Sequence, residues 1–262
     1  MRLQDKVILI TASTRGIGLA CVHACAREGA RVYMAARSPE RAQSIAEQLN
    51  AQGCRVKCVY NDASQPETFS SMVDTVFADA GRLDALVNNF GTSDPSRDLD
   101  FARTDPEVFL NTVTMNLRSV FLAGQAALKH MRATGGSIVN ISSIGGQVPD
   151  ISQVAYGTSK AAINYLTKLI ALQEGRHRIR CNAVLPGMTA TEAVQTNLSP
   201  AFRERFLRRI PLGRMAEPEE IAAAVVYLVS DEAAYTTGQL LTVAGGFALG
   251  SPLYGDDQAL SR

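Results

Sequence analysis

Short apolar runs alternate with longer amphipathic stretches from one end of the chain to the other. The first run, KVILIT over 6–11, is rich in β-branched residues, which is typical of a buried parallel strand. The stretch after Gly18 spaces its apolar residues as a helix does and closes near Gly29. The same alternation predicts six further strands, over 31–37, 55–60, 84–89, 136–142, 179–186 and 239–246.

The segments between these strands predict helices. Ser38 and Pro39 are suited to the N-cap and first turn of a helix that runs to about Asn50. Further helices are expected over 65–80, 106–132, 154–175 and 217–230. Continuous strand–helix alternation predicts an α/β protein with one domain over 1–262. We expect a doubly wound, Rossmann-type parallel sheet of about seven strands with helices on both faces.

Two segments lie outside this alternation. The irregular stretch 188–212 follows the sixth predicted strand, and we expect it to form a substrate lid. Residues 247–262 extend past the seventh strand as a C-terminal tail.

Composition narrows the class of protein. A formal net charge of +1 over 262 residues gives no argument for a nucleic-acid partner. No apolar run approaches the roughly 20 residues of a membrane helix, and the first six residues carry charges where a signal peptide is apolar. The 5 cysteines form no Cys-x-x-Cys pair, so free thiols and no metal site are expected. We therefore expect a cytoplasmic protein that binds neither membranes nor nucleic acid.

The segment TASTRGIG, over 11–18, joins the first strand to the first helix. Gly16 and Gly18 would let the backbone approach a pyrophosphate, which the N–H groups at a helix N-terminus bind well. Ala12 stands where such a turn usually opens with glycine. Because a Cβ disfavours the left-handed region, we expect a negative φ at Ala12.

Two arginines indicate which dinucleotide would bind. Arg37 ends the second strand, where NAD-binding proteins carry an acidic residue for the ribose 2′-hydroxyl. A guanidinium cannot accept that hydrogen bond but pairs well with a 2′-phosphate, and Arg15 with the hydroxyls of Thr14 and Ser38 could join it. The pattern favours NADP(H); the alternative is that both arginines are solvated surface charges.

Five motifs in order resemble the short-chain dehydrogenase/reductase family over essentially the whole chain: TASTRGIG, NNFG (88–91), NISS (140–143), YGTSK (156–160) and LPGMTAT (185–191). Ala12 and Phe90 depart from the family pattern. The resemblance implies an oxidoreductase, commonly a homotetramer. With the turn, it implies these cofactor-binding residues: Thr11, Ser13, Thr14, Arg15, Gly16, Ile17, Gly18, Arg37, Ser38, Asp62, Asn89, Gly91, Tyr156, Lys160, Pro186, Gly187 and Thr189. Asp62 is equally suited to cap a turn.

The candidate catalytic residues are Ser143, Tyr156 and Lys160. Tyr156 and Lys160 lie one helical turn apart, and Ser143 precedes Tyr156 by thirteen residues at the tip of a strand. A phenol with pKa ~10 is a poor acid–base group at neutral pH, and a nearby ammonium is expected to lower that pKa. Ser143 could hydrogen-bond a carbonyl oxygen while a nicotinamide supplies hydride. The resemblance adds Asn116 as holder of a water relay to Lys160; otherwise it is a tolerated polar residue within a helix.

The substrate is suggested by the expected lid. Phe202, Phe206 and Ile210 recur every four residues as one apolar helical face, and arginines occupy other faces. Either this helix packs over the site with hydrated arginines, or it covers a rigid hydrocarbon that bears a carboxylate, as a bile acid does. The segments 149–164 and 243–254 resemble the bacterial NADP-dependent 7α-hydroxysteroid dehydrogenases, which implies a bile-acid or other steroid substrate.

Three alternatives stay open. The same chemistry could act at another steroid position, 3α or 12α. A 3-oxoacyl-[acyl-carrier-protein] reductase would need a basic patch for its acidic partner, with Lys129, His130 and Arg132 as candidates. A redox-sensing NADPH-binding protein without turnover would not need the complete catalytic set.

Overall fold

Seven parallel strands form one sheet in the computed structural model, which describes residues 1–250. The strands are β1 (Val7–Ile10), β2 (Arg31–Ala36), β3 (Arg55–Tyr60), β4 (Ala85–Asn88), β5 (Gly136–Ile141), β6 (Ile179–Pro186) and β7 (Leu240–Val243). Their order across the sheet is β3-β2-β1-β4-β5-β6-β7, and every pair is parallel. Strand order reverses between β1 and β4, so their carboxyl ends border the crevice where such sheets bind ligands.

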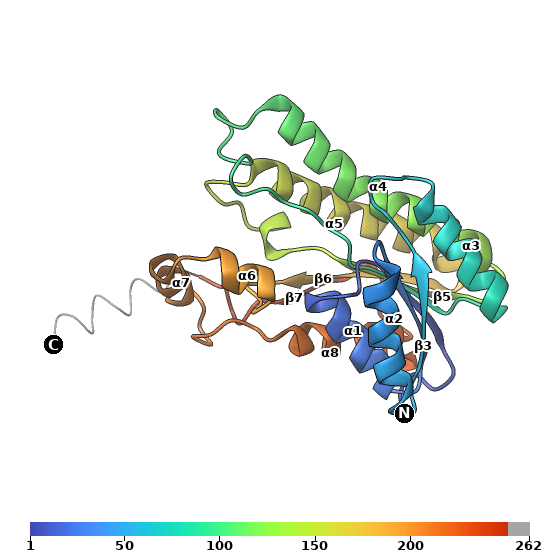
Figure 1. Ribbon diagram of the computed structural model, residues 1–262. Helices are drawn as coiled ribbons and strands as arrows, with labels where there is room; N and C mark the ends of the chain where they lie inside the picture. The colour runs from blue at the N-terminus through green and yellow to red at the C-terminus, as the bar shows by residue number, and fades with distance from the viewer. Residues whose placement is uncertain (251–262) are drawn as a thin grey trace.

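Helices cover both faces of the sheet (Figure 1). On one face lie α1 (Gly16–Arg27), α2 (Pro39–Asn50) and α8 (Pro218–Val229). On the other lie α3 (Thr68–Ala80), α4 (Pro106–Met131) and α5 (Val154–Glu174). Short 3₁₀ turns follow β5 (η1, Ile144–Gly146), α5 (η2, Gly175–His177) and α8 (η3, Asp231–Ala233). The expected doubly wound α/β fold is confirmed.

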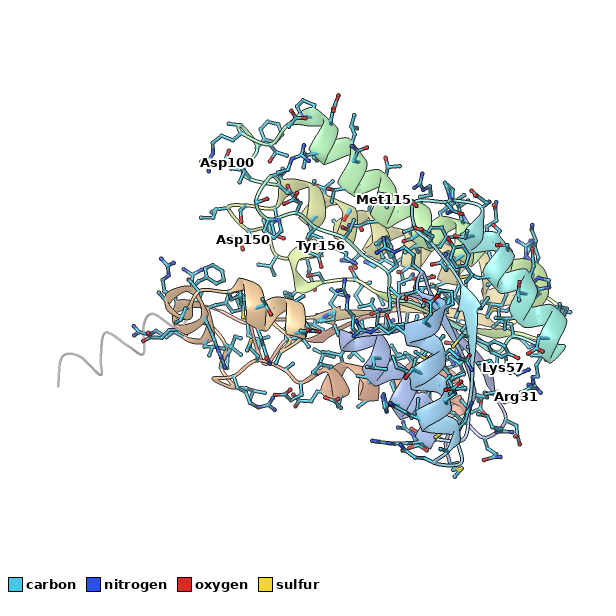
Figure 2. All side chains as sticks on the ribbon, viewed as in Figure 1. Arg31, Lys57, Asp100, Met115, Asp150 and Tyr156 are labelled. Carbon is cyan, nitrogen blue, oxygen red and sulfur yellow. The ribbon has the colours of Figure 1, made fainter. Side chains whose placement is uncertain are left out.

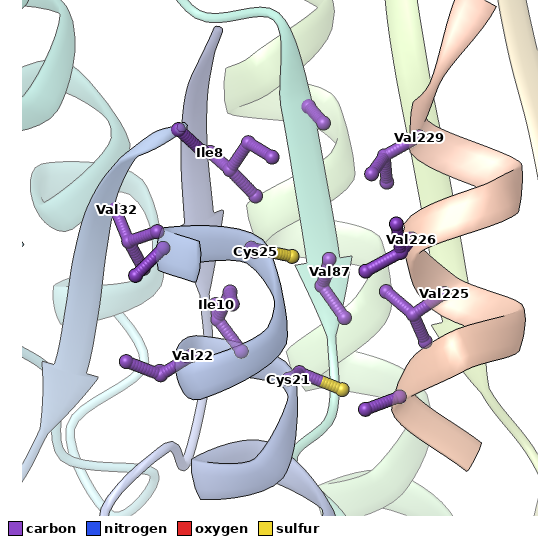
Figure 3. Packing of buried hydrophobic residues seen from close by; sticks show 14 of the residues in the cluster. Ile8, Ile10, Cys21, Val22, Cys25, Val32, Val87, Val225, Val226 and Val229 are labelled. Carbon is purple, nitrogen blue, oxygen red and sulfur yellow. The ribbon is translucent and has the colours of Figure 1, made fainter. Parts of the chain in front are cut away.

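Two buried thiols lie in the core beneath α1. Cys21 and Cys25 share one helix face and pack among aliphatic side chains of β1, β4 and α8 (Figure 3). Burial raises the pKa of the Cys25 thiol to about 12. All 5 cysteines are free, as expected, and these two behave as small apolar residues.

Several predicted boundaries move by one to three residues. The first helix begins at Gly16, two residues early, because Arg15 already takes the extended conformation of an N-cap. The third begins at Thr68 rather than Gln65, because the Thr68 N–H and hydroxyl both donate to the Gln65 carbonyl in a separate turn. The last strand ends at Val243, since Gly245 and Gly246 take positive φ.

The expected lid segment, 188–212, contains two helices rather than irregular chain. They are α6 (Glu192–Asn197) and α7 (Pro200–Leu207), and they project beyond the sheet at the left of Figure 1. Of the expected tail, 247–262, the part from 251 onward lies outside the described residues. Within residues 1–250 no helix combines the length and the apolar character needed to cross a bilayer.

Candidate active site

The turn between β1 and α1 is tied to the end of β4. The buried Thr11 hydroxyl accepts the N–H groups of Asn89 (2.9 Å) and Phe90 (3.0 Å). The Asn89 side-chain amide donates to the carbonyl oxygens of Thr11 (3.2 Å) and Ala12 (3.0 Å). The Ser13 side chain is also buried, and both its N–H and its hydroxyl donate to the carbonyl of Ala35. These three predicted cofactor-binding side chains therefore shape the turn through bonds within the protein.

The backbone at Ala12 differs from our expectation. Its φ is +50°, in the left-handed region, so the prediction of a negative φ is wrong. This conformation costs a residue with a Cβ about 1–2 kcal/mol. It lets the Ala12 carbonyl accept from the Asn89 side chain while the next N–H reaches Ala35 across the sheet. The short methyl group makes alanine the least obstructive substitute for glycine here.

The glycines of the turn allow close packing within the protein that a side chain would prevent. A Cβ added to Gly18 would lie 2.5 Å from both the Ala12 carbonyl oxygen and the Asn89 amide nitrogen. Gly16 has φ +53° and lies against Thr191 of the segment after β6. No side chain within residues 1–250 caps the start of α1, and its first turn has no acidic residue. These features fit a pyrophosphate on the helix N-terminus.

The two arginines proposed for a 2′-phosphate are exposed near this turn. Arg37 and Ser38 follow β2 directly, and Arg15 precedes α1. Within the described chain neither arginine forms a salt bridge, which leaves both guanidinium groups available to an anion. Hydrogen bonds from Ser64 (2.9 and 2.8 Å), with the nearby Arg37 charge, lower the pKa of Asp62. Asp62 thus closes a turn, and its predicted contact with the adenine stays a prediction.

The three catalytic candidates meet at the carboxyl end of β5. Ser143 caps η1, where its Oγ accepts the N–H of Gly145 at 3.1 Å. Tyr156 is the third residue of α5 and lies at the end of that helix nearer to α6 in Figure 2. One turn later, the buried Lys160 Nζ donates to the Ile141 carbonyl at 2.9 Å and lies 5.6 Å from the centroid of the Tyr156 ring.

The pKa of Tyr156 differs from our expectation. Loss of solvent raises the pKa of the Tyr156 hydroxyl, and hydrogen bonding with Ser143 lowers it only in part. The expected net lowering by Lys160 is therefore wrong for this arrangement, in which the Nζ atom is bonded to the Ile141 carbonyl. Burial lowers the pKa of Lys160 to about 8.

Asn116 connects α4 to both the catalytic helix and the loop after β4. Its Oδ1 accepts the N–H of Thr92 (2.8 Å), while its Nδ2 donates to the Thr92 carbonyl (3.0 Å) and to the Ser159 hydroxyl (2.9 Å). A Cβ added to Gly91 would lie 3.0 Å from the Lys160 Nζ and 3.9 Å from the Asn116 Oδ1. The fold thus brings Asn116, Gly91 and Lys160 together. The water relay from Asn116 to Lys160 stays a prediction.

The segment after β6 borders the same crevice. Gly187 packs so closely against the segment after β7 that an added Cβ would lie 2.8 Å from the Ala244 Cα. Thr189 is buried, donates its hydroxyl to the Gly187 carbonyl at 3.1 Å and bridges to Ala216. Pro186 ends β6 and is buried. These positions agree with the expected nicotinamide end of the site, which stays a prediction.

Asp98 is a site residue that the sequence did not indicate. It is fully buried in the loop between β4 and α4, and its carboxylate accepts the N–H groups of Ala155 (2.9 Å) and Tyr156 (2.8 Å). The loop contains several other aspartates at similar positions, among them Asp94 and Asp100. Because the contact joins residues 57 and 58 positions apart, no local pattern could have found it.

The lid is built differently from the expected single apolar face. Helix α7 ends at Leu207, so Ile210 is buried beyond the helix rather than on a common face with Phe202 and Phe206. Phe206 stacks on Phe247 at 5.1 Å between ring centroids, and Phe202 is 41% exposed. A cavity of about 360 Å³ opens between α6 and α7. Its lining includes three polar side chains, Gln195, Arg203 and Glu204, and five apolar residues: Val194, Leu198, Pro200, Leu207 and Met215.

Residues 1–250 hold no group of three or more His, Cys, Asp or Glu side chains that could bind a metal ion.

Comparisons with known proteins place this site in a family. A family model described as enoyl-(acyl carrier protein) reductase matches residues 11–248. A 7α-hydroxysteroid dehydrogenase of Clostridium sardiniense is 49% identical over 256 residues, covering 97% of this chain and 98% of that protein. A 3-oxoacyl-[acyl-carrier-protein] reductase of Thermotoga maritima is 36% identical over 250 residues, covering 95% of this chain and 100% of that protein.

A solved structure titled "Crystal structure of gox2181" superposes with a TM-score of 0.91 at 31% identity, covering 95% of this chain and 98% of that one. The matches span nearly the full length of each chain, and the ordered motifs of the sequence meet at one crevice. The chain therefore belongs to the short-chain dehydrogenase/reductase family and is an oxidoreductase that acts on hydroxyl groups with a nicotinamide cofactor.

Proposed function

We propose that this enzyme is an NADP(H)-dependent hydroxysteroid dehydrogenase that interconverts the 7α-hydroxyl group and the 7-ketone of bile acids. The convergence of Ser143, Tyr156 and Lys160 at the end of β5 carries the chemical part of the proposal. The full-length relative at 49% identity, named for the 7α position, supports the substrate part. The reaction is reversible, so the ratio of oxidised to reduced cofactor sets its direction.

The chain's own residues handle the proton of this reaction. When bound, the nicotinamide ring exchanges a hydride with carbon 7 of the substrate. Tyr156 takes the hydroxyl proton during oxidation and returns it during reduction. Ser143 stabilises the developing negative charge on the substrate oxygen through a hydrogen bond. Lys160, whose Nζ lies 5.6 Å from the centroid of the Tyr156 ring, is placed to attract the phenolate that forms when Tyr156 gives up its proton.

The preference for NADP(H) rests on Arg15 and Arg37. Both are exposed cations beside the turn that fits a pyrophosphate, and within residues 1–250 neither forms a salt bridge. A 2′-phosphate accepts charge-assisted, bidentate bonds from guanidinium groups. An NAD-specific site would need an acceptor for the 2′-hydroxyl at the end of β2, where this chain has Arg37.

A 3-oxoacyl-[acyl-carrier-protein] reductase is the second candidate, favoured by the relative at 36% identity. Its expected basic patch is weakened in this structure. His130 is paired with Asp74 at 2.8 Å, and Arg132 makes two bonds to Glu174 at 2.9 and 2.7 Å. Two of the three candidate cations therefore have acidic partners of their own, which favours the steroid over the carrier-bound substrate.

Exposed apolar side chains support a homotetramer, which we also propose. Tyr165 and Leu172 on α5 are 66% and 82% exposed, and Leu241 on the edge strand β7 is 37% exposed. Large apolar groups on a helix and on a sheet edge are suited to contacts between subunits. Light scattering of the purified protein measures its mass directly, and a monomer would contradict this part of the proposal.

A substrate panel tests the function. Chenodeoxycholate and cholate carry a 7α-hydroxyl, whereas deoxycholate has hydroxyls only at positions 3 and 12. We expect reduction of NADP⁺ with the first two and none with deoxycholate, because deoxycholate lacks the 7α-hydroxyl. All three share the 3α-hydroxyl, so this difference cannot come from a reaction at position 3. Turnover of deoxycholate would move the reaction to another position. Turnover of a 3-oxoacyl thioester with NADPH, without any bile-acid reaction, would favour the second candidate.

A further inference from the structure

The start of α5 is held by a loop distant in sequence. The N–H groups of Ala155 and Tyr156 donate to the two carboxylate oxygens of Asp98, at 2.9 and 2.8 Å. The two preceding N–H groups, of Gln153 and Val154, donate to the carbonyl oxygens of Asp98 (3.1 Å) and Leu99 (3.3 Å). Four successive donors at the start of the catalytic helix are therefore satisfied by two neighbouring residues.

Helix α5 has no local substitute for these acceptors. Its N-cap residue, Gln153, has φ +59° and makes no capping bond with its side chain. The first N–H groups of a helix have no partner within the helix, and buried ones must find an acceptor elsewhere. Asp98 is 0% exposed, so water cannot replace its carboxylate there.

The loop that carries Asp98 is itself braced. The Asp98 N–H donates to the Asp94 carbonyl at 2.7 Å. The Leu99 N–H donates to the Thr104 hydroxyl at 2.9 Å, and that hydroxyl donates to the Asp100 carbonyl at 2.9 Å. Figure 2 marks Asp100 and Tyr156 on the loop and on the helix that it holds. These bonds fix the position and orientation of the Asp98 carboxylate relative to the start of α5.

We propose that Asp98 is a positioning residue for the reaction: its buried carboxylate fixes the main chain at Tyr156 and thereby aims the tyrosine hydroxyl at the substrate and at Ser143. This inference rests on the proposed acid–base role of Tyr156. Tyr156 is itself one of the two residues whose N–H groups the carboxylate binds, so a shift of the helix start moves the reactive hydroxyl directly. A misplacement of about 1 Å is enough to reduce a reaction rate on the order of 10²-fold.

Asp98→Asn is the principal test, with Asp105→Asn as its matched control. The amide introduced by Asp98→Asn would present an NH₂ group to one of the two helix N–H donors, which breaks one bond with almost no change of volume. Asp105 also accepts a helix N–H, that of Glu107 at 2.7 Å, but it is exposed and caps α4. The two substitutions therefore remove the same kind of bond, one at the buried start of the helix that carries Tyr156 and one at the exposed start of α4.

We expect kcat of Asp98→Asn to fall on the order of 10²-fold across the pH range, with the Kd for NADPH within about twofold of wild type. Asp105→Asn should keep its kcat within about twofold. Titration with NADPH counts the folded binding sites, so kcat can be calculated per folded enzyme. If the lower activity of Asp98→Asn came only from a smaller number of folded sites, the inference would be overturned. An unchanged kcat in Asp98→Asn, or an equal loss in Asp105→Asn, would overturn it too.

Two further measurements keep the inference testable if Asp98→Asn does not fold. Thr104→Val removes only the brace of the loop and should reduce kcat about two- to tenfold with NADPH binding unchanged. Amide hydrogen exchange should show faster exchange at Ala155 and Tyr156 in Thr104→Val, independently of activity. Unchanged exchange with unchanged kcat would contradict the positioning role. Absence of turnover in the wild type would instead contradict the proposed function.

Discussion

The start of α5 and the lid formed by α6 and α7 are built in opposite ways. Around Tyr156, buried polar groups satisfy one another: Asp98 binds the helix start, Asn116 binds Ser159, and Lys160 binds the Ile141 carbonyl. The lid is mostly exposed, has few bonds to the rest of the protein and borders an open cavity of about 360 Å³. The start of α5 therefore holds its side chains in fixed positions, whereas the lid leaves space between its two helices.

This difference separates chemistry from selectivity. Proton transfer needs the donor and acceptor within hydrogen-bond reach, so a rigid, fully bonded surrounding favours it. An exposed segment that packs through aromatic stacking, such as Phe206 on Phe247, can adapt to different hydrocarbon shapes. Substitutions near α5 should therefore change kcat, and substitutions in the lid should change KM.

The largest expected effect follows removal of the Tyr156 hydroxyl. Tyr156→Phe should reduce kcat roughly 10²–10⁴-fold, the usual contribution of a general acid–base group. NADPH binding should remain, because the substitution removes a single oxygen and keeps the aromatic ring in place. Steady-state kinetics and a fluorescence titration of NADPH check the two parts. Activity near that of wild type would show that another group carries the proton.

Arg37→Asp should change cofactor preference rather than chemistry. The exchange replaces a charge-assisted bond to the 2′-phosphate with a repulsion, so the ratio of kcat/KM for NADP⁺ to that for NAD⁺ should fall on the order of 10²-fold. Arg27→Asp, at the exposed opposite end of α1, is the control and should leave the ratio unchanged. An unaltered ratio in Arg37→Asp would mean that its charge lies away from the cofactor.

Phe206→Ala should weaken binding of the steroid without slowing the chemistry. The stack on Phe247 helps to hold α7 in the position in which the lid covers the steroid. Its loss removes about 0.5–1.5 kcal/mol of aromatic contact, so KM for the bile acid should rise about two- to tenfold with kcat unchanged. Tyr235→Ala, which removes a fully exposed aromatic ring, should change neither constant. A fall in kcat for Phe206→Ala would show that the lid and the catalytic end are coupled.

The smallest signal is the ionisation of one tyrosine among 7. Burial raises the pKa of the Tyr156 hydroxyl above its ordinary value, although hydrogen bonding with Ser143 lowers it in part. Ultraviolet difference titration should therefore give wild type no more tyrosinate at neutral pH than Tyr156→Phe. An extra tyrosinate in the wild type at neutral pH would contradict this direction of the shift.

The sequence predicts the core of this protein well because buried parallel strands have a simple signature. All seven strands and six core helices are present, and Ser143, Tyr156 and Lys160 meet as their spacing indicated. Ends of elements were less accurate, since hydrogen bonds in turns, such as those of Thr68, decide them. The spacing of Phe202, Phe206 and Ile210 suggested one helix face, but the helix ends at Leu207.

Contacts between distant segments were beyond the sequence. The positive φ of Ala12 results from bonds to Asn89 and Ala35, which pattern rules for a single turn do not include. Asp98 acts on a helix 57 residues later, and nothing in its neighbourhood distinguishes it from Asp94 or Asp100. The raised pKa of Tyr156 reflects a solvent environment that only the folded chain creates.

Transfer of deuterium from carbon 7 tests the central proposal most directly. Chenodeoxycholate with deuterium at the 7β position is incubated with the enzyme and NADP⁺, and both products are analysed by mass spectrometry. We predict one deuterium in NADPH for each 7-ketone formed, since hydride passes from that carbon to the nicotinamide while Tyr156 handles only the proton. Unlabelled NADPH formed together with a ketone at another position, or no NADPH at all, would contradict the proposal.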